Sequence, residues 1–316
     1  MVLHRKKVLL VSAIWSLTLA FIYLRTFLLN PGLVIYGDVI FPLDFGANKF
    51  LTQIWDSRVS SLSPIPFLLL YYPIALLSSN TELISKMLFL FIFAMMGFSA
   101  CYMTLYFARR VRDKLAMYAI AISSSVVSMY NPWVYVASHG YLFLLLGYAL
   151  TPLILALFSQ MLQDKEKWAQ RAIAAAILFA IAAIDPRNMI FILLLLLCYA
   201  VYHCLFLDSG IGYFSSFKRV TTFLIIHGSF ISYWMIPLTY QFMHAHQVWP
   251  HLPYSHISFL SSRSDLLSVF RLGGSYLGTP IDKILFSTDP IVVITLMLPF
   301  FSFLSLLARP YGKDAL

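Results

Sequence analysis

Long apolar runs alternate with short polar stretches along this chain, and the length of the runs predicts helices that cross a lipid bilayer. A membrane-spanning helix needs about 20 predominantly apolar residues. Eight runs approach or exceed that length: residues 8–29, 87–107, 115–129, 141–162, 172–184, 189–207, 220–240 and 291–307. The pattern therefore indicates an all-α, polytopic membrane protein with about eight transmembrane helices in a single transmembrane domain, residues 1–316.

Two of these runs and one further stretch are too short to span the bilayer unaided. Runs 115–129 and 172–184 must continue into flanking polar residues or bury their ends in protein. The stretch 65–77 is as short as the run 172–184 and contains two prolines and two tyrosines. We expect it to form a re-entrant or interfacial helix in the first outer loop. The first run is expected to remain as an anchor, because it is too long for the apolar part of a cleavable signal peptide.

The composition makes the bilayer the natural solvent of this chain. Hydrophobic residues make up 60% of the sequence, charged residues make up 11%, and the mean hydropathy is +0.82. One soluble core could not hide that much apolar surface. The net charge of +9 comes from basic residues in short clusters between the runs. Such clusters are typical of the loops that orient a membrane protein, and not of a groove that binds nucleic acid. We therefore expect no nucleic-acid partner.

The basic clusters also orient the chain. If the stretch 65–77 does not span, the clusters in residues 5–7, 109–114, 165–171, 218–219 and 309–313 all fall on one side of the membrane. If it spans, they divide between two sides. The positive-inside rule favours the first count, which predicts a multi-pass protein of the cell membrane with both termini cytoplasmic.

This topology gives the outer face most of the irregular backbone. It carries two long segments, residues 30–86 and 241–290, and two short turns, residues 130–140 and 185–188. Connecting segments of this kind usually carry the functional residues of a protein. We therefore expect the active face to be extracytoplasmic.

An acidic turn opens the first long outer segment. Asp38 follows Gly37 shortly after the first span, and Asp44 lies on the same loop. Carboxylates are energetically unfavourable at a membrane boundary, which makes them candidates for chemistry. Asp38 could act as a general base, with Asp44 orienting it or holding a divalent cation. The alternative is a turn in which Asp44 caps a helix, and both interpretations stay open.

The two short turns offer residues that could bind a substrate. Arg187 could hold a phosphate group in a bidentate manner, with Asp185 fixing its direction. The alternative is an internal Asp–Arg pair that closes a tight turn. In the other turn, His139 could bind phosphate or sugar hydroxyls, while Trp133 could line the same site or belong to an aromatic belt.

The second long outer segment gathers four histidines with Trp249 and Tyr254. The histidine spacing does not match a helix-borne zinc site, so we expect no metal centre here. The aromatic rings suit a surface that binds sugars or lipid headgroups. Arg271 is a second cation that could lie near a bound phosphate. Nucleotide-binding and nucleophile-elbow motifs are absent, so no cofactor is expected beyond a divalent cation at the acidic turn.

Several blocks of the sequence resemble one family of membrane enzymes. Residues 130–134 (Tyr-Asn-Pro-Trp-Val), 139–140 (His-Gly) and 144–152 (Leu-Leu-Leu-Gly-Tyr-Ala-Leu-Thr-Pro) are similar to a block in the arabinofuranosyltransferase-like membrane proteins of mycobacterial cell-wall synthesis and their archaeal relatives. Gly37-Asp38 with Pro42 resembles the opening of their first outer loop. One span followed by a long outer loop that opens with an aspartate is similar to the GT-C class of integral-membrane glycosyltransferases.

The resemblance implies a GT-C-like fold and transfer of a sugar from a polyprenyl-phosphate-linked donor. Asp38 matches the catalytic base of the family, and Asp44 is a weaker match. The acceptor would be a glycan, lipid or protein on the extracytoplasmic face, and membrane lipids would surround the chain. The alternative is a non-catalytic membrane component that binds or translocates a lipid-linked saccharide, or a truncated subunit that depends on a partner subunit.

Overall fold

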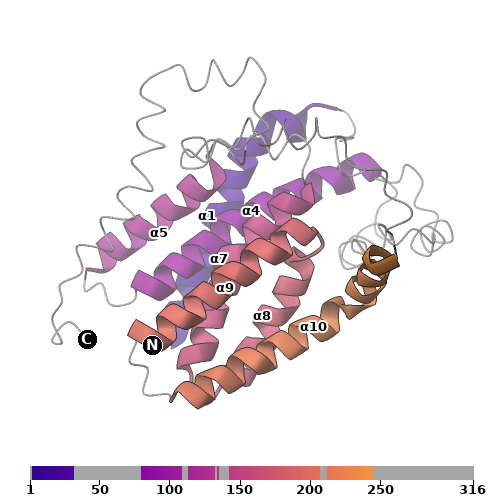
Figure 1. Cartoon of the computed structure of the whole chain (residues 1–316). Helices are drawn as coiled ribbons and strands as arrows, with labels where there is room; N and C mark the ends of the chain where they lie inside the picture. The colour runs from indigo at the N-terminus through magenta and orange to yellow at the C-terminus, as the bar shows by residue number, and fades with distance from the viewer. Residues whose placement is uncertain are drawn as a thin grey trace, which may run out of the picture. The chain divides into compact units, whose positions relative to one another are not determined.

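The structure, a computed structural model, describes residues 2–31, 80–108, 113–131, 134, 142–206 and 212–244 (Figure 1). Every regular element in this part of the chain is an α-helix. The helices are α1 (Val2–Leu29), α4 (Thr81–Phe107), α5 (Lys114–Met129), α7 (Leu142–Gln163), α8 (Trp168–Ala182), α9 (Pro186–Phe206) and α10 (Tyr213–His244). All of them belong to one compact unit.

The helices fall on the apolar runs that the sequence predicts to span a membrane. Five of them, α1, α4, α7, α9 and α10, are long and apolar enough to cross a bilayer, and α5 and α8 are the two shorter apolar helices. The chain is therefore a multi-pass, all-helical protein in the residues that the structure describes. The predicted run 291–307 and the predicted interfacial helix 65–77 lie outside those residues.

Several helices extend beyond their apolar runs. Helix α4 begins at Thr81 and not at residue 87, because the side-chain oxygen of Asn80 accepts a hydrogen bond from the Leu83 amide at 3.1 Å and caps the helix. Such a cap satisfies one of the amides that a helix start leaves without a partner. The last residues of the outer segment predicted at 30–86 are therefore helical. Helix α10 likewise begins at Tyr213, before its apolar run at residue 220.

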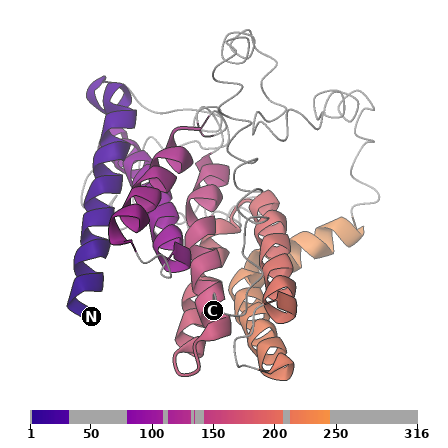
Figure 2. The same ribbon diagram turned by 90° about the vertical axis from the view of Figure 1, so that its left-hand side faces the viewer.

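Five of the described helices pack side by side in a row, and the two others lie against this row. Helix α1 packs on α4, α4 on α7, α7 on α8 and α8 on α10, while α5 lies on α4 and α9 lies on α7. Figure 2 shows this order from the indigo α1 through the magenta helices to the orange α10. Helices α1, α4, α9 and α10 also leave large apolar side chains exposed, as expected for surfaces that face lipid, whereas the central α7 exposes none.

Small residues let the helices approach one another closely. A Cβ atom added to Gly97 of α4 would lie 2.7 Å from the sulfur of Met129 and 3.1 Å from Cβ of Ser16. In α8, alanines supply most of the buried positions. Close packing of small residues drives helix association in lipid, where the hydrophobic effect does not act between helices.

Candidate functional site

The predicted site residues divide sharply between the described part of the chain and the rest. Asp185 and Arg187 lie in the described part, at the start of α9. The other five lie outside the described residues: Asp38, Asp44, Trp133, His139 and Arg271. Their roles therefore stay predictions, and the geometry of the candidate site is built from the Asp185 turn and its neighbours.

Asp185 forms the start of α9. Helix α8 ends at Ala182, a short turn follows, and Pro186 is the first residue of α9. The Oδ1 atom of Asp185 accepts a hydrogen bond from the Arg187 amide at 2.9 Å. An aspartate cap followed by proline is a favourable helix start, because proline has no amide to satisfy and its φ angle already suits a helix.

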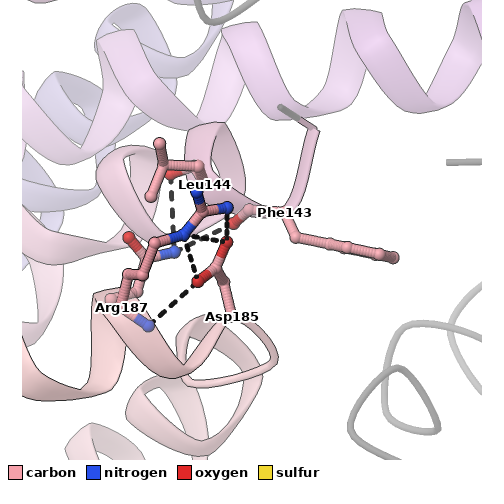
Figure 3. A network of polar contacts seen from close by, with 5 residues as sticks. Phe143, Leu144, Asp185 and Arg187 are labelled. Carbon is pink, nitrogen blue, oxygen red and sulfur yellow. Dashed lines mark hydrogen bonds and ion pairs between the residues drawn. The ribbon is translucent and has the colours of Figure 1, made fainter. Parts of the chain in front are cut away.

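The same carboxylate also holds the Arg187 side chain. Nη2 of Arg187 lies 2.6 Å from Oδ2 of Asp185, and Nε lies 3.0 Å from Oδ1, so the contact is bidentate (Figure 3). The Asp185 side chain is 7% exposed and the Arg187 side chain is 45% exposed. The internal pair that closes the turn is thus present. Phosphate binding by Arg187 stays a prediction.

Asn188 joins this turn to α7. Its Nδ2 atom donates to the main-chain oxygen of Phe143 at 2.9 Å, in the first turn of α7. The amide lies directly over Gly147, where an added Cβ atom would come within 1.9 Å of Nδ2. Gly147 is therefore the residue that lets the start of α9 reach the start of α7. The sequence pattern does not predict this pair, although a glycine inside an apolar span is a recognised signal of close helix approach.

Lys86 is a buried cation that the sequence pattern does not mark as a site residue. Its Nζ atom donates to Oε1 of Glu82 at 2.5 Å and to the main-chain oxygen of Asn30 at 2.6 Å. Asn30 directly follows α1, so Lys86 of α4 supplies a donor to the end of α1. These contacts tie together the two ends of the segment that carries Asp38 and Asp44.

Lys86→Met should lower the free energy of unfolding by about 2 kcal/mol, because it removes hydrogen bonds of a charged donor and leaves a helix-end carbonyl without its partner. Thermal unfolding in mild detergent would measure the change. Lys114→Met, at an exposed lysine that begins α5, is the control and should change stability by less than about 0.5 kcal/mol. Equal effects of the two substitutions would contradict the role of Lys86.

A polar cluster lies inside the bundle, between α4, α7 and α9. Ser159 is fully buried, and its Oγ atom lies 2.5 Å from the hydroxyl of Tyr199. Tyr106 donates to Oε1 of Gln163 at 2.9 Å. His203, one turn after Tyr199, is also buried, and neither of its ring nitrogens has a hydrogen-bond partner among the described residues. Hydrogen bonds of this kind hold helices together in lipid.

No group of three or more His, Cys, Asp or Glu side chains in the described ranges could hold a metal ion. The candidate site is accordingly an Asp–Arg–Asn turn at the junction of α8, α9 and α7, and the acidic loop lies outside the described residues. Its chemistry is that of one oriented, half-exposed guanidinium at the start of a helix. Such a position suits a negatively charged group, because the amides of a helix start carry positive partial charge.

The fold and this site define the class of the protein as a polytopic, all-helical membrane protein. Comparison with known proteins found no matching family model, no matching curated protein and no matching solved structure. The family resemblance of the residues 130–152 therefore remains an expectation from sequence.

Proposed function

We propose that this protein is a membrane glycosyltransferase that transfers a sugar from a polyprenyl-phosphate-linked donor to an acceptor on the extracytoplasmic face. Asp38 takes the proton of an acceptor hydroxyl, and the hydroxyl oxygen attacks the anomeric carbon of the donor sugar. The bond between that carbon and the phosphate oxygen breaks, and the polyprenyl phosphate leaves with the bonding electrons. General-base catalysis of this kind contributes typically 10²- to 10⁴-fold to a rate.

The observation that supports the proposal most directly is the geometry of Arg187. Its guanidinium is 45% exposed, and Asp185 fixes its direction at the start of α9. A planar guanidinium beside a helix N-terminus attracts a phosphate by charge and by hydrogen bonds. The pair with Asp185 lowers the net charge of the turn, so the amides at the start of α9 would have to contribute as well.

The contacts that the Asp185 carboxylate makes within its own turn favour a second function. The carboxylate caps α9 and pairs with Arg187, so the turn has a full structural role without any ligand. The protein would then be a non-catalytic membrane component that binds or translocates a lipid-linked saccharide, or a subunit that works with a partner. This alternative requires neither Asp38 nor Asp44 to act as a base.

Transfer of radiolabelled sugar from a panel of polyprenyl-phosphate donors, measured in proteoliposomes, tests the proposal. Asp38→Asn should reduce transfer at least a hundredfold while donor binding is kept, because only the base is lost. Asp113→Asn is the matched control, since Asp113 is an exposed cap of α5 and asparagine caps equally well. It should transfer sugar at the wild-type rate.

Arg187→Gln separates the two functions further. Under the transferase proposal it should weaken donor binding and slow transfer together, because it removes the cation beside the leaving phosphate. Donor binding by the wild-type protein without transfer, across the whole panel, would instead support the non-catalytic component. Full activity of Asp38→Asn would contradict Asp38 as the base.

A further inference from the structure

Four basic side chains gather at one end of the bundle, where the turn between α7 and α8 meets the first turns of α10. Lys165 and Lys167 lie in the turn, Arg171 follows in α8, and Lys218 lies in α10. We call this group the basic end. The three lysines are exposed and Arg171 is half-buried. No step of the proposed function uses any of them.

A buried arginine places α10 against the turn. Nη1 of Arg219 donates to the main-chain oxygens of Met161 and Asp164, both at 2.7 Å, and its guanidinium lies 5.5 Å from the ring centre of Trp168. Lys218 is the preceding residue in α10. The basic end is therefore a defined surface held by contacts between α7, α8 and α10, and not a set of unrelated loop residues.

The two carboxylates of the turn, Asp164 and Glu166, offset only part of the charge of the four cations and leave an excess of two positive charges. The Oδ1 atom of Asp164 accepts hydrogen bonds from the amides of Lys167 and Glu166, and these bonds lower the pKa of Asp164. The nearby charges of Arg171 and Lys167 lower this pKa further, so Asp164 offsets part of their charge. No salt bridge joins any of the four cations to a carboxylate within the described residues. An excess of cations at a protein surface attracts anions.

Exposed aromatic residues place the basic end at the level of the membrane surface. Tyr213, Phe214 and Phe217 of the first turns of α10 are 71%, 82% and 69% exposed. Tyrosine rings concentrate at the height of the lipid headgroups, and phenylalanine rings enter the boundary between headgroups and acyl chains. Lysine side chains extend from that height to the phosphates.

We propose that the basic end binds the headgroup phosphate of an anionic phospholipid of the surrounding membrane. The aromatic rim favours lipid over a nucleic acid or an acidic protein, because Phe214 and Phe217 would enter the acyl region while the lysines contact phosphate. Each basic residue near an anionic membrane surface contributes about fivefold in affinity. The inference is independent of the glycosyltransferase proposal, since neither Asp38 nor Arg187 takes part.

Native mass spectrometry of the full chain, released from mild detergent with phosphatidylglycerol or phosphatidylcholine, tests the inference. Wild type should bind phosphatidylglycerol more tightly than phosphatidylcholine. The triple variant Lys165→Gln, Lys167→Gln, Lys218→Gln should lose about fivefold of the affinity for phosphatidylglycerol for each lysine removed. Its affinity for phosphatidylcholine should not change, which shows that the protein is still folded.

Two control variants test whether the charge of these lysines, and their position at the basic end, cause the preference for phosphatidylglycerol. Replacement of the same three lysines by arginine keeps the charges and should keep the preference for phosphatidylglycerol. Lys114→Gln removes an exposed lysine from the start of α5 and should leave the preference intact. Equal binding of phosphatidylglycerol by wild type and the glutamine variant would overturn the inference. So would an equal loss in Lys114→Gln, or displacement of the lipid by a short RNA or an acidic peptide.

Discussion

Gly147→Ala is expected to destabilise the bundle by about 3 kcal/mol or more, through a single added methyl group. The new Cβ atom would lie 1.9 Å from Nδ2 and 2.2 Å from Cγ of Asn188. The amide cannot shift without breaking its 2.9 Å hydrogen bond to the main chain of Phe143, and Asn188 is 7% exposed. Overpacking and a buried amide without a partner each contribute about 1–3 kcal/mol.

Other glycines provide a graded series of controls for this prediction. Nothing lies within 4 Å of a Cβ atom added to Gly228 of α10, so Gly228→Ala should be neutral or stabilising by up to about 1 kcal/mol. Gly97→Ala should fall between the two, because its nearest neighbour is the flexible end of Met129. Equilibrium unfolding in mixed micelles would rank the three variants. Equal stability of Gly147→Ala and Gly228→Ala would contradict the close contact between Gly147 and Asn188.

A double-mutant cycle identifies the cause of the Gly147 effect. In an Asn188→Ala background the added methyl group meets no amide, so Gly147→Ala should cause much less further destabilisation. Additive effects of the two substitutions would show that Gly147 acts through some other neighbour. The coupling would also measure how strongly the start of α9 is held to α7.

Arg219→Leu is expected to lower the free energy of unfolding by about 3 kcal/mol. The substitution removes the donor shared by the main-chain oxygens of Met161 and Asp164, at the end of α7 where helix carbonyls lack internal partners. It also removes the contact with Trp168. Hydrogen bonds of a charged donor contribute about 1.5–3 kcal/mol each, and Arg219 is 8% exposed, so water cannot easily replace it.

Thermal unfolding in detergent without anionic lipid would measure the Arg219 effect. Lys218→Leu is the matched control, because it replaces the neighbouring cation of α10, which is exposed, by the same apolar side chain. Its effect should stay within about 0.5 kcal/mol. Arg219→Lys should be intermediate, since one ammonium group cannot reproduce the fork of a guanidinium. A larger loss in Lys218→Leu than in Arg219→Leu would refute the role of Arg219.

The positions of the helices are predictable from sequence because an apolar run of membrane length has few alternative structures. Their ends are less predictable, since a helix continues through polar residues until a cap or a proline stops it. Lys86 illustrates the difference. Its charge assigns it to the predicted outer segment, yet it lies in α4 and donates to the end of α1.

The contacts of the candidate site are only partly predictable. The pairing of Asp185 with Arg187 is local, and proline after aspartate is a recognisable helix start, so the sequence carries that signal. The approach of Asn188 to Gly147 joins two helices through residues far apart in the chain, and no local pattern contains it. The same holds for Arg219, whose partners lie at the end of α7.

The shortness of α8 has a consequence for the membrane itself. Its 15 residues rise about 22 Å, whereas the hydrocarbon core of a bilayer is about 30 Å thick. Because α8 leads directly to Asp185, we expect the lipid beside this corner to thin, or the polar turn to lie below the headgroups. The length of the acyl chains around the protein therefore affects how deep the Asp185–Arg187 pair lies in the membrane. That depth in turn affects how much water reaches the pair.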